Sequence, residues 1–163
     1  MQASPNSALV LFPLGEQRDH FASFFDWWVT YGNIILSLSD DFPEAESALN
    51  GRFTRLTNET ENLFFASDLL SHLHKTGTKR LYFLGADVFG RMETTIRAAY
   101  GLSYDPVLLW DANRFGVLSH SDHSRLTRYC EQIKIEDFLK ASEHGWADFS
   151  AEPAKLACFR LPG

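Results

Sequence analysis

The stretch from residue 81 to residue 111 constrains the fold of this chain more than any other. Leu81 to Leu84 is an apolar run typical of a buried strand, and residues 93 to 100 have the pattern of a helix. Gly85 and Gly90 stand five positions apart between them, which gives the order strand, G-x-x-x-x-G, helix of a phosphate-holding loop. A second apolar run, 107 to 110, follows and ends at Asp111. The sequence therefore predicts a strand-loop-helix-strand unit of an α/β domain.

The loop has the glycines of a phosphate loop without its chemistry. Arg91 stands where a lysine is needed, and its planar guanidinium is not equivalent to an ammonium group. Met92 cannot bind magnesium, and Asp87 adds a negative charge to the loop. Two interpretations remain, a simple strand-to-helix turn and an anion site. The residues that would form the anion site are Gly85, Gly90, Arg91, Arg114 and His120. Asp111 is interpreted as a turn residue whose side chain binds backbone N–H groups.

The spacing of apolar residues, with Gly and Pro as breaks, predicts the other elements. Further strands are expected at residues 8–14, 34–38, 106–110, 115–119 and 154–161, and helices at 16–31, 43–49, 59–75, 122–132 and 136–143. Residues 52–56 are ambiguous, with a short extended piece as one interpretation. The pair 106–110 and 115–119 reads as a hairpin, which makes the expected sheet mixed. We expect an α/β fold with an α+β tendency: a flexible N-terminus at 1–7, then one domain at 8–163 with about five strands and four to five helices.

Negative charge is concentrated in the first half of the chain. The net charge of the whole chain is −6; residues 1–78 carry 10 acids and 4 bases, and residues 79–163 carry 11 of each. An acidic face repels nucleic acid and favours a basic partner, although it can also be a simple solvated surface. The acids expected to bind such a partner are Asp40, Asp41, Glu44 and Glu46.

Large aromatic residues crowd one predicted helix. Residues 24 to 28 read Phe-Phe-Asp-Trp-Trp, which places four rings on an arc too wide for one core face. Either Trp27 or Phe24 is therefore expected to reach the surface, where it would serve as an anchor for a protein partner. The alternative is a helix packed on both sides within the domain.

Several classes of site are disfavoured. Cys130 and Cys158 are far apart and form no C-x-x-C motif, which argues against a zinc ribbon and a disulfide framework but leaves one long-range disulfide open. His120 and His123 lack evident further ligands, so we expect neither a metal nor a cofactor. No G-x-S-x-G motif is present, Cys130 reads as packed within a helix, and no catalytic residue is assigned. The N-terminus resembles neither a signal peptide nor a membrane span, which favours the cytoplasm.

These observations lead first to a non-enzymatic protein-binding module. Its most concrete form is a bacterial inhibitor or immunity-type protein that occludes a basic partner. One alternative is a small enzyme or ligand-binding domain that uses residues 85–92 as a phosphate or anion site. Another is a structural subunit of a larger assembly, and a homo-oligomer is compatible with each.

Overall fold

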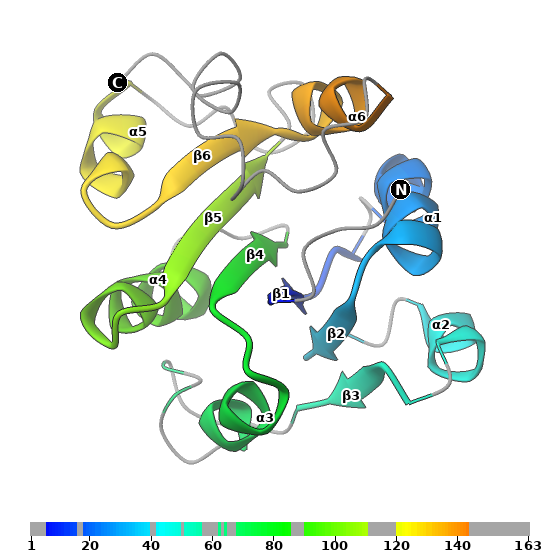
Figure 1. Ribbon diagram of the computed structural model, residues 1–163. Helices are drawn as coiled ribbons and strands as arrows, with labels where there is room; N and C mark the ends of the chain where they lie inside the picture. Colours follow the sequence, from blue (N-terminus) through cyan, green and yellow to red (C-terminus); the bar gives the residue numbers. More distant parts are fainter. Residues whose placement is uncertain are drawn as a thin grey trace.

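The computed structural model describes residues 6–15, 18–39, 42–49, 51–56, 62, 64, 68–85, 90–110 and 120–143. Six strands form one sheet in the order β3-β2-β1-β4-β5-β6. All five strand pairings are parallel, and helices cover both faces of the sheet (Figure 1). The protein is therefore a three-layer α/β domain.

Strands and helices alternate along the chain. The strands are β1 (Ser7–Leu11), β2 (Ile34–Ser37), β3 (Phe53–Arg55), β4 (Arg80–Leu84), β5 (Asp105–Trp110) and β6 (Glu131–Lys134). The helices are the 3₁₀ turn η2 (Asp19–Phe21), α1 (Ala22–Tyr31), α2 (Pro43–Ala48), α3 (Leu69–Thr76), α4 (Arg91–Gly101), α5 (His120–Thr127) and α6 (Ile135–Glu143).

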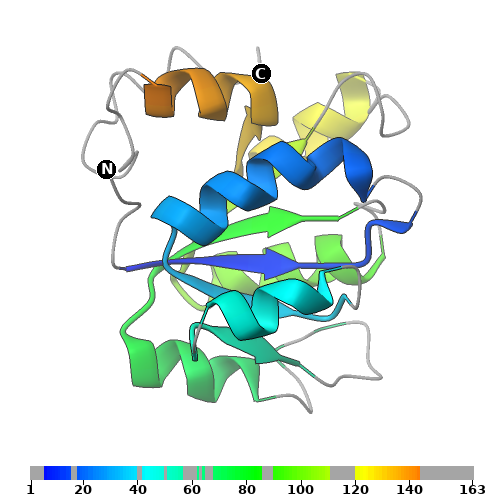
Figure 2. The ribbon, with the colours of Figure 1, turned by 90° about the vertical axis from the view of Figure 1, so that its right-hand side faces the viewer.

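The central strands are buried on both faces. Every residue of β1 and of β4 is buried, which is the pattern of a parallel sheet between two helical layers. Alternate side chains join two separate cores: Leu9 and Leu11 pack with α1, α2 and α6, whereas Ala8 and Val10 pack with α3, α4 and α5. Figure 2 shows α1 returning along β1, as a right-handed crossover to β2 requires.

Aromatic rings dominate the core on the α1 side. Phe138 of α6 makes edge contacts with Phe24 at 5.5 Å and with Tyr82 at 5.7 Å between ring centroids. Trp28 lies edge-on to Tyr82 at 5.6 Å. Such aromatic pairs stabilise the fold by more than the burial of their apolar area alone. They therefore hold α1 and α6 side by side over β4.

Gly85 sets the approach of α4 to the sheet. A Cβ atom at this position would lie 2.6 Å from Met92 Cε and 2.7 Å from Phe12 Cβ. Met92 and Phe12 are both buried, so β1, β4 and the start of α4 meet at a point that only glycine can occupy. Gly90, with φ of 83°, then leads the chain into α4. The turn interpretation of these glycines agrees with this packing.

The single α/β domain is confirmed, and the sheet differs from expectation in two respects. It has six strands, and all its pairings are parallel where a mixed sheet was expected. Two of the strands are short: β3, which lies in the ambiguous stretch 52–56, and β6, whose first two residues fall at the end of the expected 122–132 helix. β1 already begins at Ser7, inside the segment expected to be flexible. Of the expected 59–75 helix, α3 covers 69–75, and the described residues 62, 64 and 68 before it are not helical. The expected strands 115–119 and 154–161 lie outside the described residues.

Within the described part of the chain, no helix has the length and apolar character needed to cross a membrane.

Candidate functional site

The order of the strands creates one special position at the carboxyl edge of the sheet. From β1 the chain proceeds outward through β2 and β3, and from β4 it proceeds outward in the opposite direction through β5 and β6. The connections therefore diverge between β1 and β4, whose backbones pair from Ser7 opposite Arg80 to Leu11 opposite Leu84. In open parallel sheets, this divergence leaves a crevice at the carboxyl ends of the two strands, where ligands bind.

Backbone hydrogen bonds hold the carboxyl ends of β1, β2 and β4 together. Phe12 N donates to Leu84 O at 2.8 Å, and Leu38 N donates to Leu11 O at 2.8 Å. The buried Ser37 hydroxyl donates to Ser39 O at 2.9 Å and accepts from Ser39 N at 3.0 Å. Because the Ser37 hydroxyl is already both a donor and an acceptor within this turn, Ser37 is a structural residue.

Arg18 provides a cation on the α1 side of the carboxyl edge. Its guanidinium lies 4.8 Å from the centre of the Phe42 ring, and Phe42 in turn stacks on Phe25 with centroids 3.9 Å apart. Arg18 also pairs with Asp19 at 3.2 Å, but the Asp19 side chain is almost fully exposed, so water screens this pair. The aromatic stack thus orients a guanidinium near the ends of β1 and β2.

Arg91 provides a second cation, on the α4 side. It is the first residue of α4, its side chain is half-buried, and no described carboxylate pairs with it. Gly90, which precedes it, gives the helix no side-chain cap. Glu93, the acid in the first turn, is held by Arg125 at 3.1 Å. The start of α4 therefore combines the N–H groups that the first turn of a helix leaves without an intrahelical acceptor and a positive charge that no described carboxylate pairs.

The structure brings together only part of the anion site expected from the sequence. Gly85, Gly90 and Arg91 do lie together at the junction of β4 and α4. His120 begins α5, but its side chain, like that of His123, is outside the described set. Arg114, Asp87 and Asp111 also fall outside the described residues. Where the structure describes side chains, no group of three His, Cys, Asp or Glu residues could hold a metal ion.

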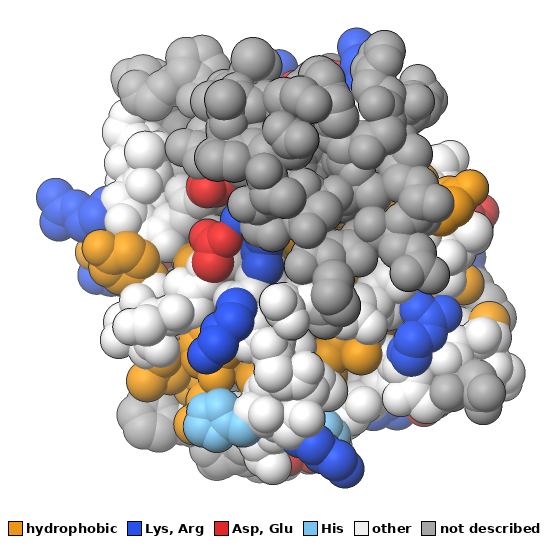
Figure 3. All heavy atoms as spheres, in the orientation of Figure 1, with side chains coloured by type: hydrophobic (Ala, Val, Ile, Leu, Met, Phe, Trp, Pro, Cys, Tyr) orange, Lys and Arg blue, Asp and Glu red, His pale blue; other side chains and the backbone are white. Residues whose placement is uncertain are grey.

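Only one of the four acids expected to bind a basic protein, Glu46, has a described side chain. Asp40 and Asp41 and the side chain of Glu44 are outside the described set, and Glu46 pairs with Arg55 at 2.9 Å. On the face drawn in Figure 3, the described charged side chains are mostly Lys and Arg. Phe24 is buried in the core, whereas Trp27 is half-buried and packs edge-on against Phe138 at 5.0 Å.

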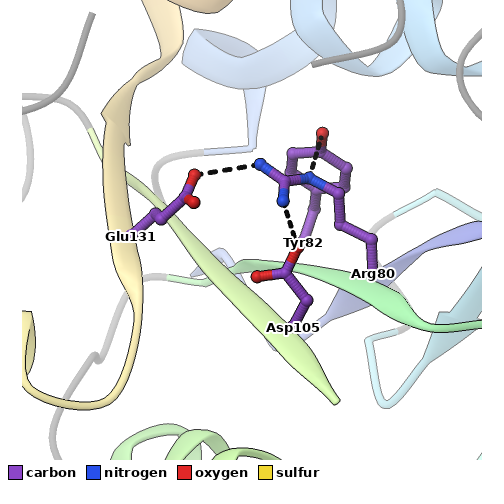
Figure 4. A network of polar contacts seen from close by, with 4 residues as sticks. All are labelled: Arg80, Tyr82, Asp105 and Glu131. Atoms are coloured by element: carbon purple, nitrogen blue, oxygen red, sulfur yellow. Dashed lines mark hydrogen bonds and ion pairs between the residues drawn. The ribbon is translucent and has the colours of Figure 1, made fainter. Parts of the chain in front are cut away.

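A buried ionic network lies at the opposite, amino edge of the sheet (Figure 4). Arg80 at the start of β4 donates to Tyr82 Oη at 3.0 Å, to Glu131 Oε2 at 3.0 Å and to Asp105 Oδ2. Burial lowers the pKa of the Arg80 guanidinium, but Tyr82, Asp105 and Glu131 outweigh it and the net pKa is raised. Burial raises the pKa of the Tyr82 hydroxyl, against the opposing effect of Arg80. Three neighbouring strands are thus joined by a permanently charged group, far from the carboxyl edge.

Cys130 has none of the properties of a catalytic nucleophile. It lies in the turn before β6, and therefore at the amino edge, where its Sγ atom donates to Leu126 O at 3.6 Å. Burial raises the pKa of its thiol to about 12, so the thiol is protonated at neutral pH. The expectation of a packed cysteine is correct, although it follows α5 instead of lying within it. Cys158 is outside the described residues.

Comparison with known proteins gives a fold but no family. No protein-family model and no curated protein matches this chain. Solved structures do match. The nicotinamidase from Staphylococcus aureus is 14% identical, with 75% of this chain and 91% of that chain covered and a TM-score of 0.60. An isochorismatase family protein from Burkholderia thailandensis is 15% identical, with 83% and 95% covered and a TM-score of 0.60. A cysteine hydrolase from Pseudomonas syringae is 12% identical, with 88% and 95% covered and a TM-score of 0.60. This chain has the isochorismatase-like α/β fold.

This likeness overturns the inhibitor hypothesis. The fold neighbours are named as a nicotinamidase, an isochorismatase family protein and a cysteine hydrolase, and these are not names of immunity-type modules. The expectation of a protein partner with a basic surface is corrected for the same reason, because it depended on the inhibitor hypothesis. The physical error was to treat net charge as evidence of function, when it constrains solubility and association rates.

Proposed function

We propose that this chain binds a small organic anion at the carboxyl edge of β1 and β4. The observation that carries the proposal is the divergence of the chain between these two adjacent parallel strands. The fold neighbours support a small-molecule ligand, because they are named as a nicotinamidase, an isochorismatase family protein and a cysteine hydrolase. We keep the cytoplasm as the proposed compartment.

The charges at this edge favour an anionic ligand. Arg91 has no carboxylate partner among the described residues, and Arg18 is held on the other side of the crevice by the ring of Phe42. A guanidinium binds a carboxylate or a phosphate through two parallel hydrogen bonds. The free N–H groups at the start of α4 would add to this attraction.

Hydrolysis of the bound molecule is our second candidate, and the likeness to hydrolases favours it. Cys130 would not be the nucleophile, because it is protonated, buried and located at the amino edge. The proposed reaction therefore does not depend on Cys130.

A thermal-shift measurement tests the binding proposal. Inorganic phosphate, acetate and benzoate serve as probes, each titrated into the wild type and into Arg91→Ala. A probe at about ten times its Kd stabilises the protein by about 1.4 kcal/mol, which raises the Tm by about 3–6 °C for a chain of this size. We expect Arg91→Ala to weaken binding by about ten-fold or more, because a charge-assisted hydrogen bond is worth about 1.5–3 kcal/mol.

Arg97→Ala is the matched control. It removes the same side chain from an exposed position on the same helix, and it should leave the shift unchanged. No shift with any probe, or equal shifts in wild type and Arg91→Ala, would refute an anion site at this edge. A panel of small amides and esters, assayed for acid release with wild type and Cys130→Ala, then tests hydrolysis. Turnover that disappears in a folded Cys130→Ala would overturn the assignment of Cys130 as a structural residue.

A further inference from the structure

The exposed hydrophobic side chains lie on opposite faces of the sheet. Among the described residues, the large hydrophobic side chains that are exposed are Tyr31 at 38%, Tyr100 at 54% and Leu102 at 49%. Tyr31 ends α1, which covers one face of the sheet, whereas Tyr100 and Leu102 lie at the end of α4, which covers the other. Neither group belongs to the proposed ligand site.

The first group, called here the α4 patch, consists of Arg97, Tyr100, Leu102, Arg128 and Tyr129. The Arg97 guanidinium lies 4.8 Å from the centre of the Tyr129 ring and donates to Tyr129 Oη at 3.2 Å. Tyr100 meets the same ring edge-on at 5.7 Å. Arg97 and Arg128 are exposed, and no described carboxylate pairs with either. Figure 3 shows hydrophobic and cationic side chains together at the left of the view, where Figure 1 places α4. The patch is aromatic, held in place by contacts among its own residues, and positive.

The second group, called here the α1 patch, consists of Asp26, Trp27, Tyr31, Glu136 and Asp137. The rings of Trp27 and Tyr31 are 5.7 Å apart, and the contact of Trp27 with Phe138 brings α6 alongside α1. No ion pair among the described residues involves any of the three acids of this patch. The described charged side chains of α1 and α6 are Asp26, Glu136, Asp137 and Lys140, three negative and one positive, which leaves a charge of −2. This patch is aromatic and negative.

We infer that the α4 patch of one copy docks on the α1 patch of a second copy. Contact between two α4 patches, or between two α1 patches, would bring like charges together, which costs free energy. Contact between unlike patches places Arg97 and Arg128 opposite Asp26 and Glu136 and covers exposed tyrosines on both sides, and Tyr and Arg are residues that anchor interfaces. Because the two patches lie on opposite faces of the sheet, the contact does not close on a two-fold axis. It generates a head-to-tail stack whose length grows with concentration.

Two variants, each lacking one patch, make a sharp test. Arg97→Ser with Tyr100→Ser removes the α4 patch, and Asp26→Ser with Tyr31→Ser removes the α1 patch. Light scattering coupled to gel filtration should show that wild type grows in mass with concentration at about 50 mM salt and dissociates at about 0.5 M salt, where screening is strong. Each variant alone should be monomeric. An equimolar mixture should form a 1:1 dimer and nothing larger, because only one intact pair of patches remains.

The control is Lys75→Ser, which removes an exposed charge on α3, outside both patches, and should behave as wild type. A wild type that stays monomeric at millimolar concentration and low salt would overturn the inference. A variant that dimerises by itself would overturn it too, since that indicates contact between identical patches. Should circular dichroism show that a double variant is unfolded, the single variants Arg97→Ser and Asp26→Ser replace it in the same mixture, with a dimer still expected.

Discussion

Arg80 offers the most decisive test of how this sheet is held together. Its side chain is 5% exposed and touches groups from three adjacent strands at the amino edge. Replacement by methionine keeps most of the aliphatic stem that packs on Tyr82 but removes the charge. The Glu131 carboxylate, only 20% exposed, would then lose its ion pair with Arg80.

The expected loss of unfolding free energy is about 3 kcal/mol. Removing one partner of a buried ion pair costs about 3–5 kcal/mol, because the remaining charge is desolvated without compensation. The lower end applies here, since the second carboxylate, Asp105, is 49% exposed and water takes over its solvation. For a domain of this size, about 3 kcal/mol lowers the Tm by about 6–12 °C.

Urea unfolding followed by tryptophan fluorescence measures this loss. The control is Lys75→Met, which removes an exposed positive charge on α3 outside the Arg80 network and should alter stability by no more than about 0.5 kcal/mol. Adding Glu131→Gln to Arg80→Met should restore part of the stability, because it removes the stranded charge. A loss below about 1 kcal/mol for Arg80→Met, or no recovery in the double variant, would refute the desolvation argument.

Three further outcomes follow from the packing and the pKa values. Gly85→Ala should destabilise the fold by about 2–3 kcal/mol, since the added methyl meets Phe12 Cβ at 2.7 Å; equal stability to wild type in urea would show that β1 can yield. Gly101→Ala, with open space around the new methyl, should instead be neutral or stabilise by up to about 1 kcal/mol in the same assay. Burial raises the pKa of Cys130 from 9.0 to about 12, so the unfolded thiol ionises first and stability falls as pH rises through this window. At about pH 10 the fall due to Cys130 is about 1.4 kcal/mol, and Cys130→Ala should lack it; identical slopes of stability against pH in the two proteins would contradict a buried thiol.

The inner strands could be predicted from the sequence because their signal is local. The apolar runs at β1, β2, β4 and β5 stand between recognisable breaks, and each was placed within a few residues. The direction of pairing was harder. Residues 81–84 and 107–110 are apolar at every position, which indicates burial on both faces and therefore a parallel sheet. The turn-like residues after Asp111 favoured a hairpin, and a hairpin requires an antiparallel pair, so the sequence was interpreted as a mixed sheet.

The edge strands could not be predicted with the same means. β3 has three residues, and β6 has four, three of them polar, so neither is long enough to show a periodic apolar pattern. Both exist because they pair with a neighbouring strand, which is a tertiary effect. The Arg80 network could not be predicted for a similar reason. Asp105 and Glu131 follow Arg80 by 25 and 51 residues, and only the register of β4, β5 and β6 brings the three side chains together.

The candidate site shows why a fold can indicate where chemistry happens without indicating which chemistry. Gly85 is required by the packing of Met92 and Phe12, whatever the chain binds, so its presence is no evidence of a ligand. Arg91, in contrast, has no structural task in the described part of the molecule: it pairs with no carboxylate and caps no helix. A half-buried charge without a structural partner carries a desolvation cost that an anionic ligand would offset. The distinction between Gly85 and Arg91 therefore separates the scaffold from the proposed function, and it makes Arg91 the residue on which a binding experiment should concentrate.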